Sequence, residues 1–109
     1  MVGDKLYVEH ILESIAKIES FVAGLDLETF RKNILVQSAV MRELEIIGEA
    51  AKKLSEEFKN QHPGISWKAV AGMRDKLAHD YFEIDVGVVW KTVIDELPKI
   101  KADLGNKIK

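Results

Sequence analysis

Cysteine is absent from this 109-residue sequence, and proline occurs only twice. The first absence excludes disulfides, thiolate zinc sites and cysteine nucleophiles, and the second leaves long stretches in which a helix meets no breaker. No apolar run approaches the roughly 20 residues that a membrane-spanning helix needs, and the N-terminus shows no leader with an apolar core. We therefore expect a cytoplasmic protein that does not engage a membrane.

The sequence also has little excess charge, because 16 basic and 18 acidic residues leave a net charge of −2. A protein that coats nucleic acid through bulk positive potential is therefore excluded, and any contact with RNA has to be local. Hydrophobic residues at 47% and charged residues at 31% are typical of a folded chain. The length predicts a single domain over residues 1–109, large enough to bury a core.

A first helix is predicted from about Asp4 to Ala23. Its apolar residues recur every three or four positions, which is typical of an amphipathic helix with one buried face. They are Ile11, Ile15, Ile18 and Val22. Asp4 has a side chain suited to an N-cap, and Gly24 can end the helix in a left-handed conformation.

A second helix is predicted to follow the N-cap Asp26 and to run from about Leu27 to Lys59, since no proline interrupts it. Its apolar stripe comprises Phe30, Ile34, Val40, Leu44, Ile47, Ala51, Leu54 and Phe58. Such a helix would be roughly 50 Å long at 1.5 Å per residue, longer than a domain of this size is wide. Part of it should project, bend or pack on another subunit, and Gly48 in its middle favours close approach of another helix.

The sequence His62-Pro63-Gly64 is the clearest break in the chain, because a residue before proline leaves the helical region and glycine takes positive φ readily. A third helix is predicted after Ser66, and a fourth after Asp85 with a kink or restart at Pro98. Their stripes comprise Trp67, Val70, Met73 and Leu77, then Val86, Trp90, Val93, Leu97, Ile100 and Leu104. No stretch alternates as a strand does, so the prediction is an all-α antiparallel bundle of four to five helices.

Residues 73–81 combine an arginine, a histidine and a tyrosine in a small polar stretch between two apolar helical runs. On an unbroken helix Arg74 and Tyr81 would lie within roughly 20° of each other, whereas Arg74 and His79 would lie roughly 140° apart. One helix face therefore cannot present all three. The helix could end near His79 so that Tyr81 folds back, a second copy of the chain could complete the site across a symmetric dimer axis, or both could hold.

A purely structural interpretation of this stretch is available. Cations near a helix C-terminus are favoured by the helix dipole, and Asp75 with His79 has the spacing of an ion pair within one helix. The functional interpretation is that His79 transfers protons near neutral pH while Arg74 holds a phosphate through two parallel hydrogen bonds. Together these groups could cleave a phosphodiester by attack of an RNA 2′-hydroxyl, a reaction that needs no metal.

Other candidates in the sequence are weaker. A run of carboxylates could bind Mg²⁺, but such runs usually form solvated helix ends or caps. They are Asp75, Asp80, Glu83 and Asp85. His10 and His62 lack neighbours that suggest a ligand set. Trp67 and Trp90 lie on apolar stripes and favour a place in the core or an interface over a base-stacking platform.

Residues 72–82, Gly-Met-Arg-Asp-Lys-Leu-Ala-His-Asp-Tyr-Phe, resemble the HEPN superfamily and within it the HepT-like toxins. That superfamily is marked by an arginine, a polar residue and a histidine four to six positions beyond the arginine, here Arg74, Asp75 and His79. The HepT-like extension to a tyrosine two positions after the histidine is met by Tyr81. Flanking matches at residues 47–50, 65–67, 84–85 and 89–90 extend the resemblance over most of the chain.

The resemblance implies a bundle of four or five helices that dimerises with the two motifs facing a shared cleft. It implies an endoribonuclease that uses neither a metal nor another cofactor. By the match, Arg74 would stabilise the phosphate, His79 would transfer protons and Asp75 would orient its neighbours.

The same resemblance implies the toxin of a toxin–antitoxin pair. Its partner would be a minimal nucleotidyltransferase, alone or within a larger hetero-oligomer, that neutralises the toxin by transferring AMP to Tyr81. Added negative charge and bulk beside Arg74 would occupy the place of the RNA phosphate. Two alternatives remain open: an inactive helical dimer that binds a nucleotidyltransferase or nucleotides, and a structural dimer in which the polar stretch is a salt-bridged helix end.

Overall fold

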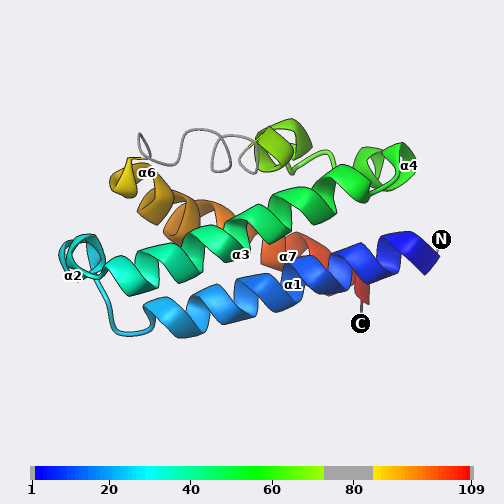
Figure 1. Ribbon diagram of the computed structural model, residues 1–109. Helices are drawn as coiled ribbons and strands as arrows, with labels where there is room; N and C mark the ends of the chain where they lie inside the picture. Colours follow the sequence, from blue (N-terminus) through cyan, green and yellow to red (C-terminus); the bar gives the residue numbers. More distant parts are fainter. Residues whose placement is uncertain (1, 73–84, 109) are drawn as a thin grey trace.

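The computed structural model describes residues 2–72 and 85–108, and all the regular secondary structure in these two ranges is helical (Figure 1). The elements are α1 (Val2–Val22), α2 (Leu27–Lys32), α3 (Ile34–Lys53), α4 (Glu56–Asn60), a helical stretch at 67–72, α6 (Val86–Lys91), the π-helix η2 (Thr92–Glu96) and α7 (Leu97–Ile108). The prediction of an all-α chain is confirmed. None of the helices in the described ranges is long and apolar enough to cross a membrane.

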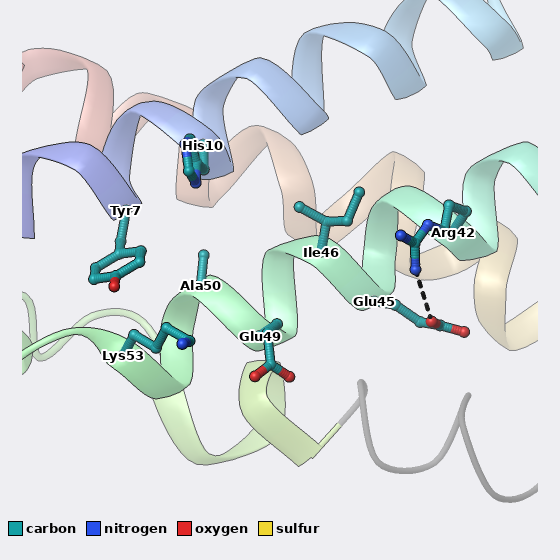
Figure 2. A pocket seen from close by; sticks show the side chains of 8 residues that line it. All are labelled: Tyr7, His10, Arg42, Glu45, Ile46, Glu49, Ala50 and Lys53. Carbon is teal, nitrogen blue, oxygen red and sulfur yellow. Dashed lines mark ion pairs between the residues drawn. The ribbon is translucent and has the colours of Figure 1, made fainter.

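Helices α1 and α3 form the centre of the bundle, lying side by side in opposite directions (Figure 1, Figure 2). The continuous run of α6, η2 and α7 packs against them, with α7 on α1 and α6 on α2. Helix α2 therefore lies at one end of the bundle, while α4 and the start of α1 lie at the other (Figure 1). This arrangement matches the antiparallel bundle that the sequence predicts.

The core consists of the apolar stripes of the helices, as their periodicity predicts. Its fully buried members are Ile11, Ile15, Ile18, Phe30, Val40, Leu44, Ile47, Ala51 and Leu104. Trp67 is also buried, with 9% of its surface exposed, and Trp90 packs against the core. Both tryptophans are thus core residues, as expected. Ile34 is the exception, because 75% of its surface is exposed.

The prediction of one helix from Leu27 to Lys59 is wrong, because the structure divides this range into α2, α3 and α4. At the first break, Asn33 leaves the helical conformation and its side chain accepts a hydrogen bond from the Val36 amide, 3.0 Å away. The Gln37 side-chain amide donates to the Phe30 carbonyl at 2.8 Å. These two hydrogen bonds satisfy a backbone carbonyl at the end of α2 and a backbone amide at the start of α3. The apolar stripe changes register at this break, which leaves Ile34 exposed.

The second break lies at Leu54 and Ser55, where Leu54 is extended and Ser55 caps α4. The Ser55 hydroxyl accepts from the Phe58 amide at 3.1 Å. It also donates to Asp4 at 2.7 Å, and the Ser55 amide donates to the same carboxylate at 2.8 Å. The prediction that Asp4 is the N-cap of the first helix is therefore wrong. Helix α1 already begins at Val2, and Asp4 ties its first turn to the second break.

The Asp4 contact predicts a specific pH dependence of stability. The Ser55 hydroxyl, followed by the Ser55 amide, lowers the pKa of Asp4 below its usual 3.8. A carboxyl whose pKa is lower in the folded state stabilises the fold above its unfolded pKa, and this contribution disappears as the pH falls through the folded pKa. We expect Asp4→Ala to melt at a lower temperature than wild type at pH 7, with the difference closing below about pH 4.

Glu9→Ala provides the control for this comparison, since Glu9 is an exposed carboxylate on the same helix. It should melt like wild type across the whole pH range. A melting difference between Asp4→Ala and wild type that stayed constant from pH 7 to pH 3 would rule out the proposed role of the carboxylate.

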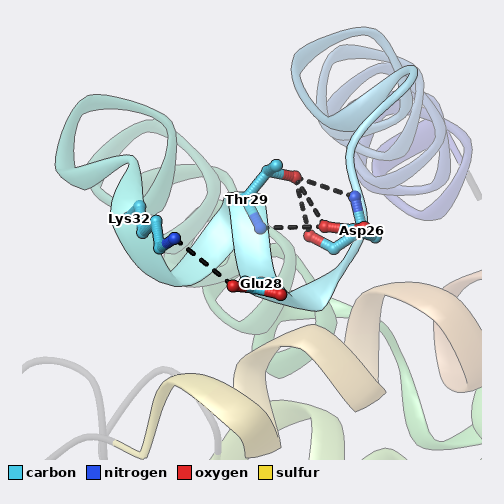
Figure 3. A network of polar contacts seen from close by, with 4 residues as sticks. All are labelled: Asp26, Glu28, Thr29 and Lys32. Carbon is cyan, nitrogen blue, oxygen red and sulfur yellow. Dashed lines mark hydrogen bonds and ion pairs between the residues drawn. The ribbon is translucent and has the colours of Figure 1, made fainter.

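Two further predicted helix-end residues, Gly24 and Asp26, are confirmed. Gly24 has φ of 78°, the left-handed conformation expected at the end of the first helix. Asp26 and Thr29 exchange hydrogen bonds in a capping box (Figure 3), with the Thr29 amide donating to the Asp26 carboxylate at 2.9 Å. Figure 3 also shows the Lys32–Glu28 ion pair one turn apart on α2, with 3.3 Å between the nitrogen and the oxygen.

The last predicted break, at Pro98, is also confirmed. The chain passes through the π-helix η2 immediately before α7, and the Leu97 amide donates to the Thr92 carbonyl five residues earlier. Pro98 then falls in the first turn of α7, and the π-helical turn immediately before it is the irregularity that its missing amide hydrogen favours. The wide turn therefore accommodates the proline without ending the helical run.

Candidate functional site

The polar stretch that the sequence singles out lies outside the described residues, so the predicted positions of Arg74, Asp75, His79 and Tyr81 remain predictions. The structure does describe the segments on either side of this stretch. The helical residues 67–72 lead into it, and Asp85 follows it at the start of α6. These two segments are held by different parts of the bundle.

The upstream segment is anchored by His62, which is 3% exposed. The His62 ring stacks on Phe58 with 4.5 Å between ring centres, and Nδ1 lies 2.9 Å from the Asp103 carboxylate on α7. The His62 carbonyl accepts from the Trp67 indole at 3.2 Å. Since a carboxylate only accepts, Nδ1 carries the hydrogen in this contact. The start of the helical residues 67–72 is therefore fixed to both α4 and α7.

This anchor could not be predicted from the sequence. His62 has no neighbours that suggest a partner, because Asp103 is 41 residues away along the chain. The prediction that His62 is not a metal ligand stays untested, but its ring has a structural partner. The sequence indicated only that the chain turns here, because a residue before proline, such as His62, is expected to leave the helical region.

The downstream segment is anchored by α6 on α2. Asp85 caps α6 by accepting from the Gly87 amide at 2.8 Å, as predicted. The Trp90 ring packs on Phe30 with 5.0 Å between ring centres. A Cβ atom at Gly87 would lie 3.1 Å from the Arg31 guanidinium and 3.1 Å from the Asp85 carboxylate. The glycine therefore permits a close approach of Arg31 to the start of α6.

A groove between α1 and α3 forms a cavity in the described part of the chain (Figure 2). Its volume is about 410 Å³. The described residues that line it are Tyr7, His10, Arg42, Glu45, Ile46, Glu49, Ala50 and Lys53. The sequence had marked none of these as functional, and His10 had seemed an isolated histidine. The groove arises only when the helices pair, because its lining comes from positions more than 30 residues apart along the chain.

The groove combines rings from α1 with charges from α3. The Tyr7 and His10 rings lie edge to face, with 6.2 Å between centres and 80° between planes. An Arg42 nitrogen lies 3.6 Å from a Glu45 oxygen, a longer distance than a hydrogen bond. Within the described ranges, no three histidine, aspartate or glutamate side chains gather as metal ligands.

The helices in the described ranges, with aromatic contacts in the segments on either side of the polar stretch, define a small all-α protein. Residues 11–105 match the family described as Ribonuclease HepT-like. The match covers most of the chain, so the chain belongs to this family. The resemblance predicted from residues 72–82 is confirmed at the level of the family, and residues 73–84 lie within the matched range.

Curated relatives agree with this assignment. The chain is 48% identical over 97 residues to the "Probable ribonuclease HepT" of Thermococcus cleftensis, covering 89% of this chain and 88% of the relative. It is 42% identical over 95 residues to a "Putative RNase" of Caldanaerobacter subterraneus subsp. tengcongensis, covering 87% and 85%. A "Putative RNase" of Methanocaldococcus jannaschii is 41% identical over 105 residues, covering 96% and 87%. No solved structure matches the chain.

Proposed function

We propose that this protein is an endoribonuclease that cleaves RNA without a metal ion. The observation that carries the proposal is the match of residues 11–105 to the Ribonuclease HepT-like family, since the matched range contains Arg74 and His79. The helical anchors at Trp67 and Asp85 support it, because they hold both ends of the segment that carries these residues. Catalytic groups need such support to keep a fixed geometry.

In the proposed reaction, the RNA 2′-hydroxyl attacks the adjacent phosphorus and the bond from phosphorus to the 5′-oxygen breaks. The attacking hydroxyl loses its proton to a general base, and the leaving oxygen gains a proton from a general acid. His79 serves one of these two steps, while Arg74 stabilises the charge that develops on the phosphoryl oxygens. Asp75 orients its neighbours. The products are a 2′,3′-cyclic phosphate and a 5′-hydroxyl end.

The site is proposed to be completed by a second copy of the chain. On a single helix Arg74 and His79 would lie roughly 140° apart, so a symmetric dimer could bring the arginine of one copy to the histidine of the other. The mass in solution, measured by light scattering, tests this assembly. A monomer that cleaves RNA at full rate would overturn it.

The activity is further proposed to be that of a toxin controlled by a nucleotidyltransferase antitoxin. The partner would transfer AMP to Tyr81, which adds a negatively charged phosphate close to Arg74 and blocks the place of the RNA phosphate. We expect wild type incubated with such a partner and ATP to gain the mass of one AMP and to lose cleavage. Tyr81→Phe should gain no mass and should keep its activity, whereas labelling of Tyr81→Phe would place the modification elsewhere.

The first test of the proposed function is cleavage of total RNA and purified tRNA by the unmodified protein in EDTA, with the ends of the fragments identified. Fragments that end in 2′,3′-cyclic phosphate are expected. If verified unmodified protein cleaves no RNA, the endoribonuclease proposal fails and the inactive binding module becomes the better explanation. Fragments that appear only after Mg²⁺ is added would contradict the metal-independent mechanism.

A further inference from the structure

The groove between α1 and α3 has no role in the proposed reaction, although its chemistry is that of a ligand site (Figure 2). Its volume of about 410 Å³ falls in the range of small-molecule pockets, roughly 300–1,000 Å³. Ile46 and Ala50 form an apolar part of its wall, and polar side chains surround them. A bound group can pack on this apolar part of the wall while the polar side chains fix its orientation.

The charges along the groove are arranged in a definite order. Arg42 and Lys53 lie 11 residues apart on α3, which places them roughly 16 Å apart along the helix axis. Glu45 and Glu49 lie between them in the sequence of the helix, and Figure 2 shows the two cationic side chains toward opposite ends of the row. A bare phosphate in the middle would meet carboxylates. A ligand with negative ends and a neutral, hydrogen-bonding centre fits this order better.

A nucleotide within a single strand of RNA has these properties. It carries a phosphate on each side and a neutral base between them, and single-stranded RNA is commonly recognised by stacking an unpaired base on an aromatic or histidine ring. His10 is exposed and Tyr7 is half-buried, so a face of either ring can take part. Glu45 can accept hydrogen bonds from the amino group of a base.

The groove is also close to the segment that carries the predicted catalytic residues. In both Figure 1 and Figure 2 the helical residues 67–72 lie beside α3, and Figure 2 shows the Glu49 side chain on that side of α3. This helical stretch leads directly toward Arg74. A nucleotide in the groove would therefore lie on the same helix, α3, that residues 67–72 flank.

We propose that the α1–α3 groove binds one unpaired nucleotide of the RNA substrate, outside the cleavage site. The base stacks on the His10 ring, with the Tyr7 ring beside it, and meets Glu45, while Arg42 and Lys53 contact the flanking phosphates. The inference rests on the proposed function, because it takes RNA as the substrate.

Binding is tested with a short, fluorescently labelled 2′-O-methyl RNA and the full-length protein in EDTA. This probe lacks the attacking hydroxyl, so binding is measured apart from cleavage. We expect His10→Ala to raise Kd by about 5- to 100-fold, the effect of losing one base-stacking ring. Arg42→Ala and Lys53→Ala should each lower the slope of log K against log salt by about 0.7, since each removes one phosphate contact with a single strand.

Lys32→Ala is the matched control. The Lys32 side chain is 75% exposed, close to the 70% of Arg42, and it lies on α2 outside the groove. It should bind the probe as wild type does. If Lys32→Ala weakens binding as much as Arg42→Ala does, the affinity comes from diffuse charge and the groove proposal fails. If the Arg42→Ala protein forms an assembly of different mass in solution from wild type, a second copy of the chain covers the groove, and the nucleotide proposal fails.

The outcomes separate this inference from the proposed function. If wild type cleaves RNA and the groove variants bind the probe normally, only the groove proposal is overturned. If the groove variants lose binding while wild type cleaves nothing, the nucleotide site stands and the nuclease proposal fails. Absence of any binding by wild type overturns the groove proposal whatever the cleavage assay shows.

Discussion

His79→Ala is expected to cleave RNA about 100- to 10,000-fold more slowly than wild type, the usual effect of removing a general acid or base. The reason is that one of the two proton transfers, from the 2′-hydroxyl or to the leaving oxygen, would lack its positioned group. The measurement is the initial rate of tRNA cleavage in EDTA at equal protein concentration. Equal melting temperatures of the variant and wild type would separate lost chemistry from lost folding.

Variants of Arg74 complete this comparison. Arg74→Ala should lose activity to a similar degree, whereas Arg74→Lys should retain more because it keeps the charge without the paired hydrogen bonds of the guanidinium. Cleavage by His79→Ala at the wild-type rate, after contaminating nucleases are excluded, would refute the catalytic assignment. Equal activity of Arg74→Ala and wild type would refute the role of the arginine in the same way.

Phe30→Ala is expected to cost about 3–5 kcal/mol in the free energy of unfolding, the range observed when a buried aromatic side chain is truncated. Phe30 is fully buried and its ring packs on Trp90, with 5.0 Å between ring centres. This ring contact is therefore one of those through which α2 holds α6. The measurement is the free energy of unfolding in denaturant, compared with wild type.

Leu35→Ala is the matched control, because Leu35 is also a large apolar residue near the α2–α3 break but is 80% exposed. Its effect should stay within about 0.5 kcal/mol. Similar losses in Phe30→Ala and Leu35→Ala would contradict the assigned packing. At a temperature well below its melting temperature, Phe30→Ala should cleave RNA faster than His79→Ala does. Phe30→Ala has lost a structural contact but keeps the proton-transfer group.

The apolar periodicity predicted which residues form the core of α1 and α3, because a stripe repeating every three or four residues has only one face to bury. Caps were predicted equally well where the hydrogen bond is local. Asp26 bonds to Thr29 and Asp85 to Gly87, only two or three residues away. Such contacts join residues close together in the sequence, so they can be predicted without knowing how the helices pack.

Asp4 shows where local reasoning fails. It has an N-cap side chain close to the start of a helix, yet its carboxylate binds Ser55, 51 residues away. The same contact stabilises the break between α3 and α4 that the continuous apolar stripe concealed. Periodicity shows only which face of a helix is apolar. When the helices before and after a break bury the same face, periodicity cannot detect the break.

The sequence by itself determined the helical class and most core positions, because these follow from periodicity, and the resemblance of residues 72–82 pointed to the family and to the candidate residues Arg74, Asp75, His79 and Tyr81. Only the tertiary structure decided where the long helix breaks, that His62 pairs with Asp103, and that Tyr7 and His10 face Arg42 and Lys53 across one groove. The physical reason is the same in each case. Contacts between residues far apart in the chain depend on how the helices pack, and no spacing along the sequence encodes that distance.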